Sequence, residues 1–357
     1  MTSTTPTESP ARPDGRAVRP PRTWADGRAH FVAALGSRWY QLIIDLHDIL
    51  ARATYEYGYA RGLKSVQIPV TTRTVTCPTG LGSDSQPVPV SVSGVSTYLS
   101  DSAQFLLEYG CRTARQGCYT ILPSFRAETP DPTHLGQFVH SEAEIRGGLE
   151  DLIEYVEGYV RHLTRAILHE YEHELARAIG DVGHLERALA RNRPFDRLTL
   201  DDAARLLSGD PDHLLSTVEG RYITRRGEQE LLRRIGEFVW VTHFDHLTVP
   251  FYQAFAADER SACNADLFFG IGEVVGSGER HIHAEDVRRA LALHRVPERD
   301  YAWYVRMKDI APIRTAGFGL GVERFLLWVL KHDDIRDIPL VSRVGEAPEW
   351  PDSIDQP

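Results

Sequence analysis

The order of the predicted elements indicates an α+β fold, in which an antiparallel sheet is flanked by helices. Three observations carry this prediction. Strand-like segments predominate over residues 64–145, a mostly helical block follows over residues 149–235, and strands return after Phe238. Near the end of the chain, glycines occupy alternate positions over residues 317–321, and an apolar run at helical spacing follows them. This pattern predicts a strand with one bare face that leads into a helix.

The composition is typical of a globular protein and excludes several functional classes. Of 357 residues, 42% are hydrophobic and 25% charged, which is enough for one large or two modest domains. The net charge of −10 argues against an extended nucleic-acid-binding surface. The four cysteines form no C-x-x-C pair, so neither a zinc ribbon nor a disulfide framework is predicted. Because no apolar run has the length of a membrane span or of a signal-peptide core, we expect a cytoplasmic protein without a membrane partner.

Three elements are predicted for residues 1–70: a tail, a helix and a strand. Residues 1–28 are rich in proline, arginine, threonine and serine, and we expect them to form a disordered tail. Apolar residues then recur at three- and four-residue steps over residues 31–62, which predicts one long amphipathic helix that stops at Gly62. The next segment, residues 64–70, reads as a strand with Pro69 at its end or on a sheet edge.

A second group of elements forms a predicted hairpin. Alternating valines over residues 88–92 suggest a strand, and residues 97–108 pass from extended chain into a short helix with Ser100 or Asp101 as its cap. Residues 118–128 read as a strand. A loop with two prolines connects it to a returning strand over residues 138–145, so the two make an antiparallel hairpin with a long loop.

One short motif admits a metal-binding interpretation. The sequence His169-Glu-Tyr-Glu-His173 is a formal H-E-x-x-H, which on a helix places both histidines on one face, as in zinc hydrolases. A charged helical face explains the same residues, and the helical block offers no distinctive third ligand, so we favour that interpretation. The pair His281 and His283 is better explained by strand-face packing or a hydrogen bond in a loop.

Three other constellations each allow two interpretations. Arg126 and Glu128 share a strand face and could bind a nucleotide phosphate and magnesium, or form a cross-strand ion pair. Residues 266–280 could supply a metal-binding acid and an arginine for a substrate carboxylate, or form a surface hairpin. The bare strand over residues 317–321, followed by Arg324, could seat a flat ring and a phosphate or reflect simple close packing.

Together these segments resemble the three-motif catalytic core of a class II aminoacyl-tRNA synthetase. The resemblance rests on the order of Pro69, S-F-R-A-E over residues 124–128, G-I-G-E-V-V-G-S-G-E-R over residues 270–280 and G-F-G-L-G-V-E-R over residues 317–324. It covers residues 30–350 and is strongest to asparaginyl- and aspartyl-tRNA synthetases. It implies one catalytic domain over residues 29–357, ATP and Mg²⁺ as cofactors, and a homodimer formed through the helix at residues 31–62 and the Pro69 strand.

The resemblance also implies an ATP site. Arg126 would hold the α-phosphate and the attacking carboxylate, and Arg324 would clamp the γ-phosphate, so these two are the implied catalytic residues. Phe125 would stack on the adenine, Glu128 would read its amino group and His134 would approach the outer phosphates. Further implied groups are the magnesium-binding acids and the glycines that seat the ribose and adenine: Glu273, Asp266, Gly317, Gly319 and Gly321.

The implied amino-acid pocket has six residues: Gln104, Leu107, Glu142, Glu144, Arg280 and Lys308. Gln104 would meet the amino group of the substrate and Arg280 the polar end of its side chain. Leu107 stands where aspartyl enzymes carry a lysine, and Glu142 stands where asparaginyl enzymes use a glutamate. The pocket therefore fits a four-carbon amino acid that ends in an amide, or aspartate in another orientation.

Departures from the family pattern lead to the functional expectation. The N-terminal anticodon-gripping barrel has no counterpart in this sequence. Other family residues are also replaced, by Thr133, Lys308 and Thr315. Together with the negative net charge, these replacements argue against tRNA as a partner. We expect an AMP-forming ligase that adenylates aspartate or an analogue for ammonia or a small amine, as in a related archaeal asparagine synthetase. The alternatives are a stand-alone asparaginyl-tRNA synthetase-like enzyme that loads tRNA or a carrier protein, and a non-catalytic adenylate-binding regulatory paralogue.

Overall fold

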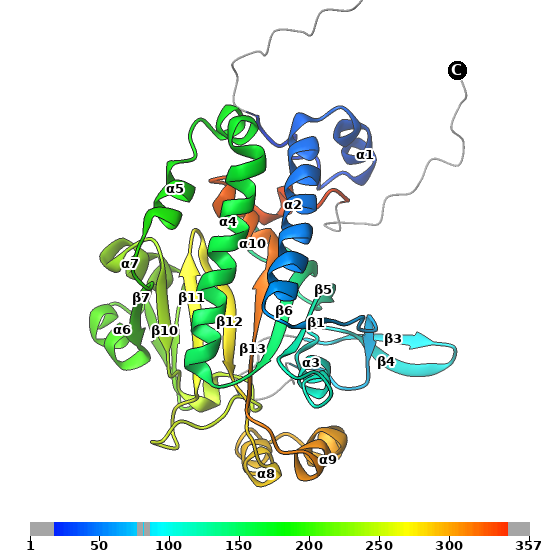
Figure 1. The fold of residues 1–357 in the computed structure, drawn as a ribbon, viewed down its shortest axis with the longest axis vertical. Coiled ribbons are helices and arrows are strands. Elements are labelled where there is room, and N and C mark those ends of the chain that lie inside the picture. Colours follow the sequence, from blue (N-terminus) through cyan, green and yellow to red (C-terminus); the bar gives the residue numbers. More distant parts are fainter. Residues whose placement is uncertain (1–17, 77–80, 82–85, 342–357) are drawn as a thin grey trace, which may run out of the picture.

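A central sheet of mostly antiparallel strands organises the computed structural model, which describes residues 18–76, 81 and 86–341 (Figure 1). The strands lie in the order β1 (Lys64–Ser65), β5 (Gly117–Phe125), β6 (Gln137–Arg146), β13 (Thr315–Gly321), β12 (Gly272–Glu279), β11 (Asn264–Phe269), β10 (Val239–Thr242) and β7 (Asp196–Thr199). The outermost pairs, β1–β5 and β10–β7, are parallel, and the pairs between them are antiparallel. The predicted α+β sheet with flanking helices is confirmed.

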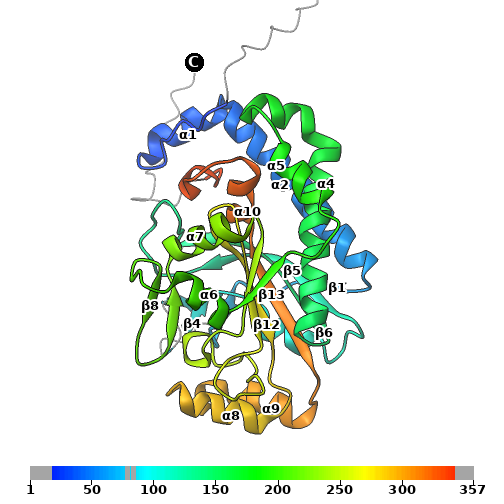
Figure 2. The same ribbon diagram turned by 90° about the vertical axis from the view of Figure 1, so that its left-hand side faces the viewer.

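Two long helices cover one face of this sheet. Helices α2 (Arg38–Ala60) and α4 (Leu149–Ile179) run side by side along it (Figures 1 and 2). They bury the apolar face of β13, where the ring of Phe318 packs against Tyr155 and Tyr159. The remaining helices of the middle segment are α5 (Gly183–Ala190), α6 (Leu200–Leu207) and α7 (Arg225–Ile235), accompanied by the short hairpin β8 (Leu214–Ser216) and β9 (Arg221–Ile223). Among the described residues, no helix combines the length and the apolar character needed to cross a membrane.

Smaller units surround the sheet. Strands β2 (Thr71–Thr72), β3 (Val88–Val92) and β4 (Val95–Leu99) form a separate sheet, and Ser93 and Gly94, both with positive φ, make the tight turn of its hairpin. Helix α3 (Gln104–Gly110) packs against β5 and β6. Helices α8 (Ala284–Leu293) and α9 (Ala302–Ile310) lie together at one end of the molecule, and α10 (Val322–Val329) follows β13 directly.

The N-terminal region differs from the prediction in two ways. The expected single helix is broken into α1 (Gly27–Leu35) and α2, because the Ser37 hydroxyl accepts a hydrogen bond from the backbone N–H of Trp39 and starts a new helix. The ordered chain also begins before residue 28. Val18 donates to the carbonyl of Ala178, and the Arg336 guanidinium lies 3.7 Å from the centre of the Trp24 ring. The prediction of disorder is therefore wrong for residues 18–26, which contact the rest of the chain. Residues 1–17 lie outside the described residues.

The H-E-x-x-H segment lies on the exposed side of α4. Its Glu170 forms an ion pair with Arg52 of α2 at 2.7 Å, while His169 and His173 are exposed to solvent. In the described part of the chain, no three His, Cys, Asp or Glu side chains are arranged to hold a metal ion. Of the other pair, His281 is buried and its Nε2 donates to the Phe251 carbonyl at 3.0 Å. Both observations agree with the structural interpretations.

Side-chain-free positions at the sheet centre create the space for a site. In the register of β12 and β13, Gly276 lies opposite Gly319 and Gly278 opposite Gly317. These four residues, which we call the glycine strip, share the sheet face away from α4. The register continues outward, so Gly317 and Gly319 lie opposite Glu144 and Glu142 of β6, respectively. On the other side, Gly276 and Gly278 lie opposite Asp266 and Asn264 of β11. The strip thus lies between two rows of polar side chains.

Adding a side chain in the glycine strip should lower the free energy of unfolding. A Cβ at position 317 would overlap Glu144 Oε2 and would lie 2.8 Å from the Ala143 carbonyl oxygen, which the sheet holds in place. Gly317→Ala should therefore destabilise the protein by at least about 2 kcal/mol in urea unfolding. The control is Gly36→Ala, where no atom lies within 4 Å of the new Cβ, and its effect should stay within about 0.5 kcal/mol. Equal stability of the two variants would contradict this account of the strip.

Candidate active site

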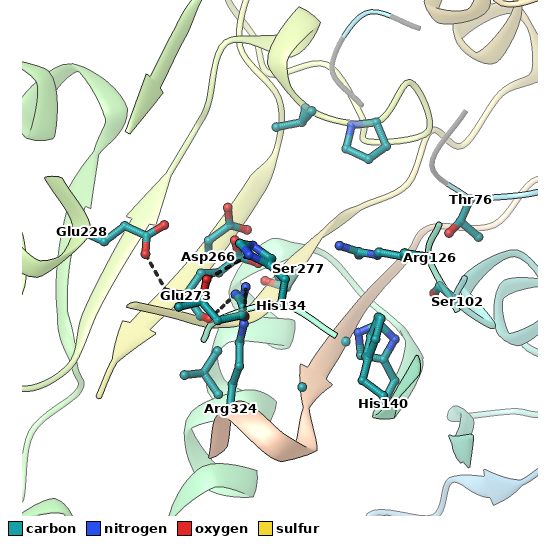
Figure 3. A pocket seen from close by; sticks show the side chains of 18 of the residues that line it. Thr76, Ser102, Arg126, His134, His140, Glu228, Asp266, Glu273, Ser277 and Arg324 are labelled. Atoms are coloured by element: carbon teal, nitrogen blue, oxygen red, sulfur yellow. Dashed lines mark hydrogen bonds between the residues drawn. The ribbon is translucent and has the colours of Figure 1, made fainter. Parts of the chain in front are cut away.

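A cavity of about 540 Å³ opens over part of the glycine strip, at Gly276 and Gly319. Strands β6, β11, β12 and β13 contribute to its wall, together with α7, the loop after β5 and residues 248–253. Figure 3 shows two groups of side chains: Glu228, Asp266 and Glu273 gather on one side, and Arg126 reaches in from the other. We call the first group the acidic end. The opposite end, where the amide side chains of Gln104 and Gln253 line the wall, is the amide end.

The acidic end collects three half-buried carboxyl groups at the cavity wall. Glu273 Oε1 and Asp266 Oδ1 both lie over Gly276, at 3.0 and 3.8 Å from the position of an added Cβ. Glu228 of α7 accepts a hydrogen bond from the backbone N–H of Glu273 at 3.1 Å. Burial, followed by the charge of Glu273, raises the pKa of Glu228 to about 7 and that of Asp266 well above its usual range. The acidic end therefore favours a bound cation, which would relieve this repulsion.

Arginines and a histidine border the acidic end. Arg324, in the first turn of α10, donates to the Glu273 carbonyl at 2.7 Å, which fixes its guanidinium beside the carboxyl groups. Arg225 of α7 also lines the cavity. His134 lines the mouth, on a loop shaped by Asp131, which accepts hydrogen bonds from the N–H groups of Thr133 and His134. These cations and the neighbouring acids form a surface suited to a metal-bound polyphosphate.

The hairpin of β5 and β6 supplies the next part of the wall. Arg126 and Glu128 both line the cavity, but β5 ends at Phe125, so they lie in the loop after it and do not share the strand face that the sequence predicted. The aromatic ring in this wall belongs to Phe138 of β6, and the Arg126 guanidinium lies 5.4 Å from its centre. Phe125, which the resemblance implied as the stacking ring, is half-buried and does not belong to the cavity lining.

The predicted amino-acid-binding residues are divided between the cavity wall and a layer behind it. Gln104 lines the amide end, whereas Leu107, Glu144, Arg280 and Lys308 are nearly fully buried behind it. Leu107 packs in an apolar cluster with Cys118 and Leu122.

Glu142 also lies behind the wall, and its carboxylate is already engaged. It accepts hydrogen bonds from the Ser102 hydroxyl at 2.7 Å and from the Ala103 N–H at 2.8 Å, and it lies 3.1 Å from His140 Nδ1. Gly319 and Gly321 belong to the cavity lining, whereas Gly317 lies beneath Glu144. The glycines therefore make room for acidic side chains as well as for a ligand.

Two ion pairs occupy the layer behind the amide end. Arg280 donates to both carboxylate oxygens of Glu144, at 3.1 and 3.0 Å. Lys308 donates to Glu108, which also accepts from the Arg112 guanidinium at 3.0 Å. Burial alone would raise the pKa of Glu108, but the charges of Lys308 and Arg112 hold it below its usual value. Lys308 thus neutralises a buried carboxylate.

The cavity lining includes residues that reasoning from the sequence did not assign to the site, among them Phe138, Glu228 and Gln253. A signal existed for Phe138, because it alternates with His140 and Glu142 along one strand and must share their face. Glu228 and Gln253 carry no motif in the sequence. They reach the site because α7 and the loop after η1 (His246–Thr248) pack over β11 and β12.

Glu323 connects the last helix to the hairpin. It is 4% exposed, and both its carboxyl oxygens lie 3.0 Å from the backbone nitrogen of Val139, which donates to them. Burial raises the pKa of Glu323 to about 7. Because Arg324 is its neighbour in α10, this contact also sets the position of Arg324 relative to β6.

Comparison with known proteins agrees with this geometry. The sequence matches the family described as tRNA synthetases class II (D, K and N) over residues 29–344. Asparagine–tRNA ligase of Thermoplasma acidophilum is 24% identical over 308 residues, which are 85% of this chain and 69% of that protein. The enzyme of the same description from Xanthomonas axonopodis is 31% identical over 267 residues, 71% of this chain and 56% of its own length.

Solved structures show the same fold. Asparaginyl-tRNA synthetase of Pyrococcus horikoshii, solved with asparaginyl-adenylate, superposes with a TM-score of 0.80 at 23% identity and covers 90% of this chain and 72% of its own. Aspartyl-tRNA synthetase of Entamoeba histolytica superposes with a TM-score of 0.69 at 18% sequence identity. The superposition covers 87% of this chain and 59% of that protein. The chain spans 56 to 69% of the length of the curated relatives.

The Glu323 contact predicts a pH dependence of stability. A folded-state pKa of about 7 against 4.5 for the free side chain means that the folded protein holds a proton that the unfolded chain releases. The resulting stability is complete below pH 4.5 and is lost as the pH rises through 7. Relative to Glu323→Gln, the wild type should lose about 3 kcal/mol of unfolding free energy between pH 4.5 and 7.5. Urea titrations of both proteins measure this difference, and a constant value across the range would exclude the buried proton.

Proposed function

The chain belongs to the class II tRNA synthetases of the D, K and N type, and we propose that it uses ATP to activate asparagine or a close analogue as its aminoacyl-adenylate. One observation carries this proposal. One cavity is lined by the acidic end with its arginines and by the two glutamines of the amide end, and Arg126 reaches in from the side opposite the acidic carboxyl groups (Figure 3). This arrangement suits a triphosphate at one end and a small polar amino acid at the other, with the reacting groups near Arg126.

The chemistry follows from where the charges lie. A carboxylate oxygen of the amino acid attacks the α-phosphorus of ATP and forms a new P–O bond. The bond between the α-phosphorus and the bridging oxygen breaks, and pyrophosphate leaves with its electron pair. Arg126 binds the α-phosphate and the attacking carboxylate, which aligns them and stabilises the charge that develops between them. Arg324, held by the Glu273 carbonyl, and His134 at the mouth bind the outer phosphates.

The residues present fit a magnesium ion. Glu273 and Asp266 offer two neighbouring carboxylates over Gly276, and Mg²⁺ binds through one or two carboxylates while keeping phosphate oxygens and water as its other ligands. The ion would neutralise the phosphates of ATP. Phe138 and Glu128 remain for the adenine, as a stacking surface and a hydrogen-bond acceptor, respectively.

We propose tRNA as the acceptor of the activated amino acid, because the asparagine–tRNA ligases named above are similar to this chain over most of its length. The transfer step would form an ester bond to the tRNA and release AMP. The net charge of −10 favours a second candidate, a small nitrogen nucleophile such as ammonia, which attacks an adenylate by the same chemistry and forms an amide.

The first test is ATP–pyrophosphate exchange, which requires no acceptor. Exchange should depend on asparagine or a four-carbon analogue and on Mg²⁺. Arg126→Ala should lower it by about 10²- to 10³-fold, because a preorganised donor to the developing charge is lost. The control is Arg306→Ala, an exposed arginine of α9, which should exchange like the wild type. Absence of exchange with every four-carbon amino acid would refute the proposed activation.

The same protein then identifies the acceptor. With labelled amino acid, total tRNA and ammonium in separate reactions, label should enter the acid-precipitable tRNA fraction and AMP should accumulate. Formation of a free amide with ammonium, without label in tRNA, would establish the second candidate in place of the first.

We further propose that two copies associate through α2 and the adjoining residues 64–69. The outer side of α2 exposes Tyr59 at 83%, Ile44 at 50% and Tyr55 at 47% of their surfaces, although the opposite side of the helix is buried. Light scattering should give twice the mass of the 40.2 kDa chain, and Tyr59→Glu with Ile44→Glu should reduce it to that of one chain. A monomeric wild-type protein at micromolar concentration would contradict this association.

A further inference from the structure

The guanidinium at the amide end is almost completely occupied by the protein itself. Arg280 is 1% exposed. Its Nε and Nη2 donate to Glu144, Nη2 also donates to Gln104 Oε1 at 2.7 Å, and Nη1 donates to Gln253 Oε1 at 3.1 Å. Four of its five N–H groups are therefore accounted for. Arg280 therefore has at most one N–H group left for a ligand. The two glutamines also separate it from the cavity.

These hydrogen bonds fix the orientation of both amides. A guanidinium group only donates, so the amide oxygens of Gln104 and Gln253 must face Arg280 and their NH₂ groups must face elsewhere. The Gln104 nitrogen lies over Gly319, beside Glu142 Oε1. Across the described residues, no hydrogen bond from the Gln253 nitrogen is found, and this side chain lines the cavity. Gln253 thus presents two N–H donors to a ligand.

The position of Gln253 is held from several directions. Its side chain fills the space over Gly278, where a Cβ would overlap the amide oxygen. Its backbone N–H donates to the Pro250 carbonyl, and its own carbonyl accepts from His246 Nε2 at 2.9 Å. The residue as a whole is 7% exposed. A donor so constrained is preorganised and loses little entropy when it binds a ligand.

The charges around this end are balanced without a ligand. Three buried cations, Arg112, Arg280 and Lys308, are each paired with a carboxylate, the first and last with Glu108 and the second with Glu144. Glu142 adds a further carboxylate close to the cavity wall. A substrate side chain that ends in a carboxylate would be desolvated here without an unpaired cation to receive it, which is costly. A neutral side chain with a carbonyl oxygen meets the donors of Gln253.

We propose that Gln253 is a specificity-determining residue that selects an uncharged, amide-bearing amino-acid side chain. Its Oε1 accepts a hydrogen bond from Arg280, and its Nε2 donates one to the side-chain carbonyl oxygen of the substrate. This inference rests on the proposed function and names its substrate class. It assigns selection to a glutamine outside the motifs that carry the family resemblance.

The test measures binding rather than turnover. Titration calorimetry compares the non-hydrolysable sulfamoyl analogues of asparaginyl- and aspartyl-adenylate, which differ only in the side-chain end. The wild type should bind the asparaginyl analogue at least tenfold more tightly. Gln253→Met, similar in length but without the amide, should lose about tenfold for the asparaginyl analogue and change by less than about threefold for the aspartyl one. ATP affinity should not change.

A second variant and a control keep the result interpretable. Gln253→Glu retains an acceptor for Arg280 but replaces the donor with an oxygen, so it should also lose the asparaginyl preference while keeping the melting temperature of the wild type. Gln229→Met, on the exposed side of α7, should behave like the wild type in both titrations.

Each outcome has a distinct meaning. Equal wild-type affinity for both analogues, or an equal loss of both in Gln253→Met, would overturn the selective role of Gln253 and leave the proposed activation intact. Selective binding without pyrophosphate exchange would refute the proposed function and retain the selection. Binding of neither analogue would refute both.

Discussion

The absence of side chains at four neighbouring positions of the central sheet is the constraint on which the site depends. Gly276 and Gly278 of β12 lie opposite Gly319 and Gly317 of β13, and the polar side chains of the flanking strands lean into the space that results. Backbone in the middle of a sheet cannot move aside, because each strand is hydrogen-bonded on both sides. The space is therefore permanent, and it explains how so many carboxyl and amide groups can be buried over one sheet face.

The two ends of the cavity differ in how their charges are balanced. At the acidic end, three carboxyl groups lie beside Arg324 and Arg225, and burial raises the pKa of Glu228 and Asp266. A cation lowers the free energy of such a group of acids. At the amide end, buried cations and carboxylates are already paired within the protein. The acidic end therefore favours a ligand that carries a cation, and the amide end favours an uncharged group.

Much of this architecture could be predicted from the sequence, because the relevant signals are local. The hairpin that carries Arg126 and Glu128 and the bare strand before Arg324 are visible as short runs with clear periodicity. The break at Ser37 depends on one capping hydrogen bond, and the order of residues 18–26 depends on contacts with residues near the other end of the chain. Gln253 and Glu228 reach the cavity only through the packing of a loop and a helix against β11 and β12. Such contacts join residues far apart in sequence, and no local pattern encodes them.

The amide end shows why the identity of a side chain is not enough to assign its role. Arg280 stands where the family resemblance implies a residue that meets the substrate, and its charge alone favours a carboxylate. In this structure Glu144 neutralises that charge, and Gln104 and Gln253 each accept one further hydrogen bond from Arg280. Leu107 packs against an apolar cluster and brings no further cation. The proposed contact to the substrate is therefore an amide N–H of Gln253 instead of a guanidinium, because residues behind the cavity wall already engage Arg280.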